Sequence, residues 1–415
     1  MKLLHYLLIA IACYFLQSCE KGNMVNPDDT EKSDPFIPIL EVNNDVIHST
    51  KDGGTFRVMI KRNISYRVKC DTWIEPDARY SSSSTLFINV NESHITSTRQ
   101  GCITIYNDQY NLSCDIVIVQ EGWNEQLVPN ENKIIYTSTD NSCLYLFDSG
   151  GDSSYLRSHF KVNSYDDGKG VMIFDIPITY LPDYFAFGDR KLETITLPNT
   201  VVEIGKSCFL YCDNLKAFYS NNAFSDNRCL VIKGELVAIA PAGLTSFTVP
   251  NSVSTIRGQT FHGCSTLKRI AIPNSVFAIG EWAFYDVEGI LEIDSSILGI
   301  DHTPSNSREW LRSSRFSEII IGDNVSSLGN YVFAGYESLE KLTIGKAVKR
   351  IGSDVFWGIA LKTVYCKPNT PPQGVNSMFN TRFDTKIYVP TESVEAYKTA
   401  KYWSAYADYI EGKDF

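Results

Sequence analysis

The chain has 415 residues, and its 38 lysine and arginine residues are outnumbered by 48 aspartate and glutamate residues, for a net charge of −10 at pH 7. An acidic chain lacks the basic surface on which nucleic acids and anionic membranes are bound, which argues against both as direct partners. The length is sufficient for two domains with sizeable cores.

An export signal is predicted at residues 1–18, where one lysine precedes an apolar run too short to span a bilayer. The sequence Leu16-Gln17-Ser18-Cys19 that follows resembles the lipobox of bacterial lipoproteins. The resemblance implies that Cys19 is acylated and anchors the chain in the outer membrane. Acidic residues after this cysteine direct some Bacteroidetes lipoproteins to the cell surface, and Glu20 has this position. The alternatives are the periplasmic face and a simple cleaved signal.

Residues 19–37 are polar and charged, with too few apolar groups to fold, and predict a flexible tether. Residues 38–122 then show short strand-like runs separated by turns, which predicts an antiparallel β-sandwich. The runs are Thr55–Lys61, Tyr66–Cys70, Thr85–Val90, Gly101–Tyr106 and Cys114–Gln120.

Residues 38–122 resemble the BACON domain, an immunoglobulin-like module of Bacteroidetes proteins. Gly53-Gly54-Thr55-Phe56, Trp73-Ile74, Arg99 with Ile103-Thr104-Ile105, and Ile116–Gly122 carry the likeness, whereas Tyr66 stands where the family often has tryptophan. The resemblance implies either carbohydrate or mucin binding or a spacer role. Trp73 is then either a platform for a sugar or part of the core, and we expect it in the core.

A repeat with the frame L-x-x-I-x-I-P-N-x-V-x-x-I-G-x-x-x-F-x-x-C-x-x-L organises the rest of the chain. It opens at residues 192, 215, 244, 267, 290, 316, 339 and 361, a period that is typical of a solenoid. In one rung, meaning one repeat, Ile270 and Ile272 form a short strand with a buried face, and Pro273 ends it. Stacked rungs then share one core beneath a parallel sheet.

The repeat resembles the BspA-like leucine-rich repeat family of bacterial surface proteins over about residues 130–415, which implies adhesion to host or neighbouring-cell components. We predict a linker and N-terminal cap at 123–191, a solenoid at 192–385 and a C-terminal cap at 386–415. Two rungs depart from the frame. One predicts a hairpin turning at Lys233-Gly234-Glu235, and the other a helical turn capped by Ser305 or Asn306. In the C-terminal cap, Lys386–Pro390 predicts the last strand and Thr391 the cap of a final helix.

No catalytic or cofactor motif is present in the sequence, so the chain is predicted to be non-enzymatic and to need no cofactor or metal. Apart from Cys13 and Cys19, nine cysteines remain, an odd number that leaves at least one unpaired. Cys212 and Cys264 share one repeat position and predict buried thiols. Cys208 and Cys212 have no partner pair that would complete a zinc site.

Aromatic residues recur beside the repeat phenylalanine and are the candidate binding residues. Trp282 and Tyr331 lie two residues before it, and Tyr285 and Trp357 one residue after it. If these positions reach the surface, the four side chains form an aromatic ridge that stacks on a sugar or a protein partner. The alternative is a scatter of surface aromatics and cap packing.

These observations predict a non-enzymatic, lipid-anchored cell-envelope binding protein or adhesin that presents its repeat surface to host or cell-surface partners. The partner is an extracellular protein or a glycan. A glycan or mucin binding protein of the outer membrane is one alternative, and a structural spacer in an envelope assembly is the other.

Overall fold

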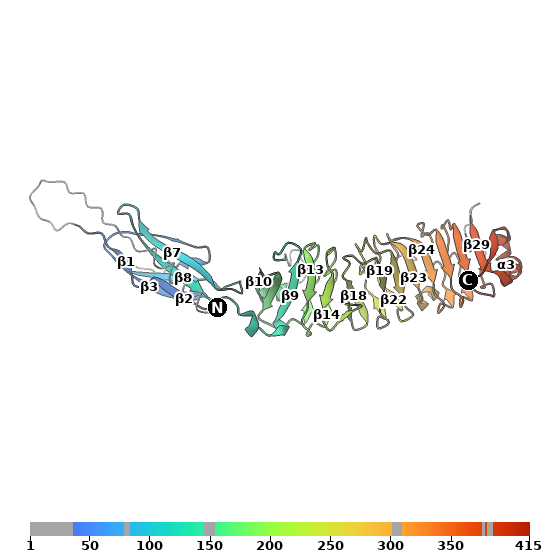
Figure 1. Cartoon of the computed structure of the whole chain (residues 1–415), viewed down its shortest axis with the longest axis horizontal. Helices are drawn as coiled ribbons and strands as arrows, with labels where there is room; N and C mark the ends of the chain where they lie inside the picture. Colours follow the sequence, from blue (N-terminus) through green and yellow to red (C-terminus); the bar gives the residue numbers. More distant parts are fainter. Residues whose placement is uncertain (1–35, 79–83, 145–153, 301–308, 376–377, 380–384) are drawn as a thin grey trace, which may run out of the picture.

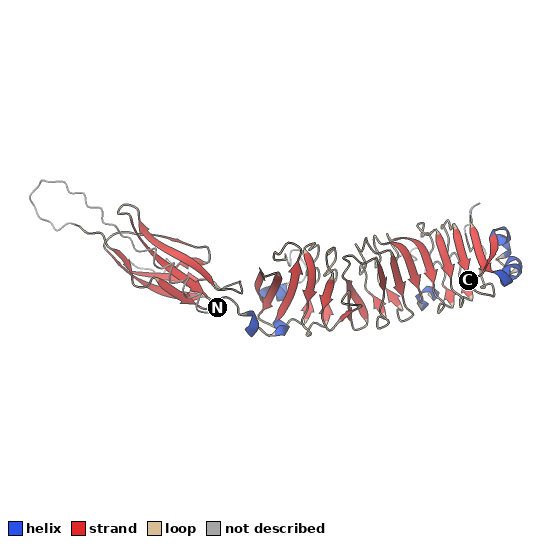
Figure 2. Ribbon diagram, viewed as in Figure 1, coloured by secondary structure: helices blue, strands red, loops and turns tan. Residues whose placement is uncertain are grey.

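The structure is a computed structural model that describes residues 36–78, 84–144, 154–300, 309–375, 378–379 and 385–415. The export signal, Cys19 and most of the tether therefore lie outside the described residues. The chain forms an elongated molecule with a β-rich unit at one end and a long stack of rungs extending away from it (Figure 1). Strands run through the whole length of the stack, and short helices lie at its C-terminal end (Figure 2).

The N-terminal unit consists of two sheets that share a core. One sheet has the order β1-β3-β6-β5 and the other β2-β8-β7-β4. Ile88 and Ile103 are fully buried between them, in phase with the alternation that predicted five of these strands. The three strands that the sequence did not predict, β1, β2 and β5, are three or four residues long. The strands are β1 (Leu40–Val42), β2 (Val46–Ser49), β3 (Gly54–Arg62), β4 (Arg67–Cys70), β5 (Ile74–Pro76), β6 (Thr85–Val90), β7 (Arg99–Asn107) and β8 (Leu112–Gln120).

Trp73 packs against this core, as expected. A Cβ atom at Gly101 would lie 2.4 Å from its ring, which shows how closely β7 approaches the indole. The Arg99 guanidinium lies 4.1 Å from the ring centroid. Since the cation covers the indole and β7 packs against it, Trp73 is poorly placed as a stacking platform for a sugar.

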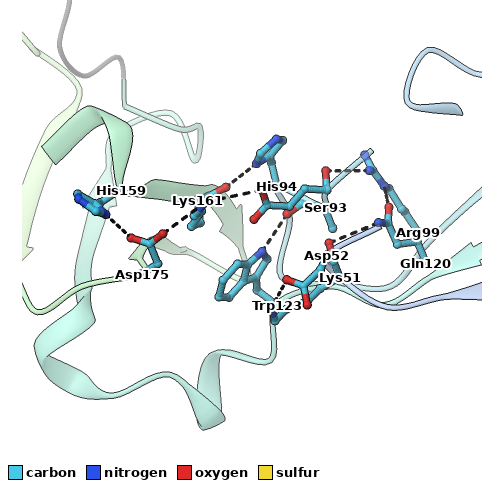
Figure 3. A network of polar contacts seen from close by, with 11 residues as sticks. Lys51, Asp52, Ser93, His94, Arg99, Gln120, Trp123, His159, Lys161 and Asp175 are labelled. Carbon is cyan, nitrogen blue, oxygen red and sulfur yellow. Dashed lines mark hydrogen bonds and ion pairs between the residues drawn. The ribbon is translucent and has the colours of Figure 1, made fainter. Parts of the chain in front are cut away.

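Direct contacts join the N-terminal unit to the stack. Trp123 donates its indole N–H to the carbonyl of Ser93 at 2.9 Å, with the Lys51 ammonium 4.1 Å from its ring. From the first strands of the stack, Lys161 approaches Glu92 at 3.7 Å, and the carbonyl of Lys161 lies 2.7 Å from His94 Nδ1 (Figure 3). The junction is thus built from side-chain contacts on both units.

Antiparallel strands close the N-terminal end of the stack. β9 pairs with β11 on one side and with the first repeat strand, β13, on the other. Shielding the end of the core in this way is what an atypical terminal unit has to do. The elements are η2 (Glu125–Leu127), η3 (Asn130–Asn132), β9 (Lys133–Ser138), α2 (Ser154–Ser158), β10 (Phe160–Asp166), β11 (Lys169–Phe174) and β12 (Tyr180–Leu181).

The predicted solenoid is confirmed. Its long sheet has the order β19-β21-β23-β24-β26-β28-β29-β30, with parallel neighbours in register one repeat apart, for example Ile319 opposite Leu342 and Leu342 opposite Val364. The strands of this face are β13 (Leu192–Thr196), β15 (Ala217–Tyr219), β19 (Ser246–Thr248), β21 (Arg269–Ile272), β23 (Glu288–Ile293), β24 (Arg315–Ile321), β26 (Lys341–Ile344), β28 (Thr363–Cys366), β29 (Lys386–Pro390) and β30 (Ile410–Lys413).

The repeat phenylalanines stack inside the solenoid. Phe261 and Phe284 lie 5.2 Å apart, and Phe333 and Phe356 lie 6.0 Å apart at 10° between ring planes. The irregular rung at 290–315 keeps this column continuous, because Trp310 lies 6.2 Å from Phe284 and 6.5 Å from Phe333. Each buried ring contributes about 1.5–3 kcal/mol of hydrophobic stabilisation.

A second ladder of two-residue strands explains the repeat glycine. At Gly205, Gly280 and Gly352 the glycine follows an apolar residue of this ladder, and the preceding rung lies directly against it. A Cβ atom at Gly280 would lie 2.4 Å from the backbone nitrogen of Gly258, so no larger residue fits. The ladder consists of β12 with β14 (Glu203–Ile204), β20 (Thr255–Ile256) with β22 (Ala278–Ile279), and β25 (Ser327–Leu328) with β27 (Arg350–Ile351).

The C-terminal end corrects two predictions. Lys386–Pro390 is not the last strand, because the chain returns after its helices and adds β30 in parallel to β29. Thr391 does not cap the helix; it donates to Asp414 Oδ1 at 2.7 Å, a contact that needs this extra strand. Tyr397 and Trp403 are fully buried and close the core. The elements are η5 (Thr391–Ser393), α3 (Val394–Thr399) and η6 (Ser404–Tyr409).

The 290–315 rung contains a helical turn within the described residues. Ser295 accepts a hydrogen bond from the Ile297 amide and begins η4 (Ser296–Gly299). Ser305 and Asn306, the predicted caps, lie outside the described residues.

We predict that Gly280→Ala destabilises the solenoid, because the new Cβ atom overlaps the preceding rung. Overpacking of this kind costs about 1–3 kcal/mol, measured as the loss in free energy of unfolding by denaturant. Glu281→Ala next to it is the control and should stay within about 0.5 kcal/mol, because Glu281 is exposed. Equal losses in the two variants would contradict the packing described here.

Candidate functional site

A hairpin buried on both faces interrupts the solenoid. It is formed by β17 (Cys229–Ile232) and β18 (Glu235–Ile239), and is called the partition hairpin below. Its turn is the predicted one, with Lys233 and Gly234 at φ 52° and 79°. The side chains of its two faces point into two separate cores. Cys229, Val231, Leu236 and Ile239 face the C-terminal core, and Leu230, Ile232, Val237 and Ala238 face the N-terminal core.

The partition hairpin breaks both ladders of the stack. Among the described strands, β15 and β19 belong to different sheets, and so do β14 and β18. In a regular rung the carbonyl before the repeat glycine accepts from the next rung, as Leu328 does from the Gly352 amide at 2.9 Å. Where the ladders break, these carbonyls need other donors, because a buried carbonyl left unbonded is costly.

Two arginines supply the missing donors. Arg257 donates to the carbonyl of Ile204 at 2.5 Å and pairs with Glu235 of the partition hairpin. Arg228 donates to the carbonyl of Ala242 at 2.6 Å and to that of Lys216. Burial lowers the pKa of Arg228, which still stays cationic at neutral pH. Each guanidinium thus bridges one side of the break.

Arg257 stands at the position that holds glycine in the other regular rungs. At Gly205, Gly280 and Gly352 the preceding rung occupies the space of a side chain. The rung that precedes Arg257 is the partition hairpin, and it leaves room for the guanidinium. The signal was present in the sequence as I-R-G in place of I-G, and the sequence analysis missed it.

The break opens a groove of about 780 Å³ on the surface. One wall comes from the rung before the partition hairpin and the other from the two rungs after it. Four carboxylates face two cationic groups, so the groove carries a negative excess. The charged and aromatic residues that line it, together with one amide, are Asp183, Glu203, Lys206, Glu235, Arg257, Gln259, Glu281 and Trp282.

Next to the groove, aromatic rings contact one another in an unbroken series, called the aromatic run below. The contact between Tyr211 and His262, with ring centroids 5.0 Å apart, crosses the break between residues 51 positions apart in sequence. The other neighbours are 4.3–5.5 Å apart. In spatial order the members are Tyr184, Phe187, Tyr211, His262, Tyr285 and Trp282.

The structure brings together two of the four predicted site residues. Trp282 and Tyr285 stack at 5.5 Å with 14° between ring planes and end the aromatic run. Tyr331 is half-buried and Trp357 is 63% exposed, and within the described part of the chain neither has a ring contact with the run. The ridge therefore continues towards the N-terminus of the stack and not past the irregular rung.

The residues that sequence reasoning missed are Tyr184, Phe187, Tyr211 and His262. They occupy positions one or two residues from the repeat phenylalanine or from Ala186, which takes its place. A search of these repeat positions that included the first rungs would have identified the four residues. Positions two before and two after the phenylalanine are left-handed, with Trp282 at φ 60° and Tyr211 at φ 63°. Left-handed backbone at a bulky residue costs about 1–2 kcal/mol, and such strain concentrates at functional positions.

His262 has an unused nitrogen within the run. Its Nε2 atom lies 3.3 Å from the Tyr211 hydroxyl, while the buried Nδ1 atom has no hydrogen-bond partner among the described residues. Burial lowers the pKa of His262, although Asp286 opposes the shift, so the ring is neutral at pH 7. The run is therefore uncharged at this point.

The cysteines of the stack are buried thiols. Cys208 and Cys212 donate to the carbonyls of Pro182 and Ala186 in the preceding rung, at 2.9 and 3.0 Å. Burial raises the pKa of Cys208, and that of Cys264, to about 12. The thiols are therefore protonated at neutral pH and serve packing, as predicted for Cys212 and Cys264. Among the described residues, no cluster of three or more histidine, cysteine or acidic side chains has the arrangement of a metal site.

The fold defines a repeat protein with stacked parallel coils and an open face. The family model of the BspA type leucine rich repeat region matches in six copies, over residues 174–228, 240–362 and 307–398, which is just over half of the chain. The chain therefore belongs to the BspA-type leucine-rich repeat family. Residues 229–239, the partition hairpin, fall between the matched stretches.

Several solved structures are similar to the stack. The pneumococcal vaccine antigen PcpA is 21% identical with a TM-score of 0.32, and a leucine rich cell surface protein from Faecalibacterium prausnitzii is 19% identical with 0.25. A leucine-rich repeat protein from Bacteroides ovatus is 18% identical with 0.24. Each similarity covers 54% of this chain. The covered share of the other chain is 55% for PcpA, 48% for the Faecalibacterium prausnitzii protein and 66% for the Bacteroides ovatus protein. Comparison with curated proteins gave no match.

We predict that Arg257→Ala lowers the free energy of unfolding by about 2–3 kcal/mol, because it removes charge-assisted hydrogen bonds and leaves the Ile204 carbonyl and Glu235 without their partner. Denaturant unfolding measures the loss. Arg350→Ala, at an exposed arginine of a regular rung, is the matched control and should change little. Similar stability of wild type and Arg257→Ala would show that the break does not depend on this side chain.

Proposed function

We propose that this chain is a non-enzymatic binding protein of the cell surface, an adhesin whose leucine-rich repeat stack engages an extracellular protein or glycan. The observation that carries the proposal is the aromatic run beside an open groove on a rigid stack. Exposed tyrosine and tryptophan side chains dominate binding energies at interfaces. A stack of rungs holds such side chains in fixed positions over an extended face.

Trp282 and Tyr285 lie in the aromatic run, and we propose them as its principal contacts. Tyr331 and Trp357 continue the same repeat positions on later rungs, where we propose that they extend the face for a large partner. The regular sheet face offers less to a partner, because oppositely charged side chains one rung apart neutralise each other there. Examples are Lys341 with Glu318 at 3.0 Å and Lys362 with Glu340 at 2.7 Å.

We infer that the N-terminal unit is a BACON-like immunoglobulin-like domain that acts as a spacer. Support comes from its two sheets around one core and from Trp73, whose ring is covered by Arg99. The contacts of Trp123 and Lys161 then transmit the position of this domain to the stack. If the domain instead captures glycan or mucin, or the whole chain is a spacer in an envelope assembly, the aromatic run is not needed for binding.

The lipobox supports lipid anchoring at Cys19 in the outer membrane, with the stack outside the cell and the periplasmic face as the other orientation. Across the described residues, no helix has the length and apolar character of a membrane span. Protease added to intact cells distinguishes the orientations, because it degrades the protein when the stack lies outside.

We predict that Cys19→Ala abolishes incorporation of labelled palmitate, because the thiol that carries the acyl group is lost. The variant should leave the membrane fraction or remain unprocessed. Labelling of wild type and variant to the same extent would rule out the anchor.

We predict that the double variant Trp282→Ala and Tyr285→Ala lowers the affinity of the mature protein for immobilised host-cell surfaces about thirtyfold or more, as expected for loss of aromatic hot spots. Thermal melting must first show that the variant is folded, since both rings are half-buried. Tyr219→Ala, at an aromatic residue of the sheet face that is 46% exposed, is the control and should bind like wild type. Loss of binding in the control alone would place the partner on the sheet face.

A further inference from the structure

The groove beside the partition hairpin contains hydrogen-bonding groups that the protein does not use. Glu203, Lys206 and Glu281 are exposed and form no ion pair among the described residues. Gln259 accepts from Ser207 through its Oε1 atom at 2.8 Å, which leaves its amide N–H groups free to donate. Unused donors and acceptors thus line one groove.

Arg257 and Glu235 form the fixed part of the groove. The guanidinium is held by the Ile204 carbonyl and by Glu235, and its side chain is 23% exposed. These two groups neutralise each other and cannot move without breaking the bridge across the stack. They therefore position the walls, whereas Glu203, Lys206, Gln259 and Glu281 remain available to a ligand.

Trp282 adds an aromatic wall. Its backbone is left-handed at φ 60°, its ring stacks with Tyr285, and it lines the groove. An aromatic ring beside groups that donate and accept hydrogen bonds suits a ligand with two kinds of surface. A pyranose ring is such a ligand, because its C–H face is apolar and its rim carries hydroxyl groups that both donate and accept.

Size and charge distinguish the classes of ligand. A volume of about 780 Å³ lies within the range of small-ligand sites. Charged residues are depleted at the centres of protein interfaces, and this groove is mostly charged. Four carboxylates against two cations disfavour an anionic ligand.

We propose that the groove beside the partition hairpin binds a short neutral oligosaccharide. Glu203 and Glu281 accept hydrogen bonds from its hydroxyl groups, Lys206 and Gln259 donate to them, and Trp282 packs on one sugar ring. The inference rests on the proposed function as a surface binding protein, and it names the ligand class of one part of that surface.

The experiment applies the labelled mature protein to a printed array of neutral and acidic oligosaccharides, followed by calorimetry with the neutral oligosaccharide that gives the strongest signal. Trp282→Ala and the double variant Glu203→Gln and Glu281→Gln should each raise Kd tenfold or more. The glutamine changes are at exposed positions and leave the fold intact, so a folding defect of Trp282→Ala does not decide the result. Kd should stay within twofold between low and high salt, because the ligand is uncharged.

Matched controls lie outside the groove. Tyr219→Ala removes an aromatic ring of the sheet face that is 46% exposed, and Glu337→Gln an exposed carboxylate, and both should retain Kd within twofold. The proposal is overturned if no neutral oligosaccharide binds, if the groove variants bind as wild type does, or if acidic oligosaccharides or polylysine bind in preference. If adhesion to host-cell surfaces persists while every oligosaccharide fails, the ligand class is wrong and the proposed function stands; if both fail, so does the proposed function.

Discussion

Burial of the partition hairpin on both faces is the constraint on which the stack depends. A regular rung of this solenoid packs side chains against its two neighbours in one continuous core. The partition hairpin instead ends one core on Leu230 and Ile232 and begins the other on Val231 and Leu236. The alternation along β17 suits this role, because successive side chains of a strand point to opposite faces. Both hydrophobic cores are therefore covered at the hairpin, although the strand ladders are interrupted there.

The partition hairpin covers the cores, but the backbone carbonyls at the edges of the break still need hydrogen-bond donors. Arg228 donates to the Lys216 carbonyl and Arg257 to the Ile204 carbonyl, two groups whose equivalents in regular rungs accept from the next rung. On the outside, the rungs before and after the partition hairpin meet through side chains, as the Tyr211 and His262 contact shows. The same interruption thus produces the groove and brings the two halves of the aromatic run together. A departure from the repeat, and not the repeat itself, creates the most distinctive surface of the molecule.

Much of the fold could be predicted from the sequence because it depends on local patterns. The period of about 23 residues positioned the repeat strands, and alternation within the hairpin rung with Gly234 positioned its turn. Prediction failed where one residue acts on another that is a rung or more away. Thr391 was assigned to a helix cap because a local role is all that a sequence motif shows, whereas its actual partner, Asp414, directly follows the returning strand.

The candidate site was predicted in part for the same reason. Repeat phase identified Trp282 and Tyr285, but it extended the ridge in the direction of Tyr331 across the long 290–315 rung. There Trp310 preserves the internal column of rings while the surface series ends. In the other direction, the contact between Tyr211 and His262 continues the run and joins residues 51 positions apart. This contact exists because the partition hairpin replaces a regular rung between the two residues. No spacing rule within a single rung contains this information.

Hydrogen–deuterium exchange of wild type and Arg257→Ala, resolved by peptide, tests most directly whether a side chain holds the two cores together across the break. We predict faster exchange in the variant for peptides that span residues 203–209 and 235–240, which flank the bridge, and unchanged exchange over residues 326–352 in regular rungs. Faster exchange spread evenly along the stack, or none at all, would contradict it.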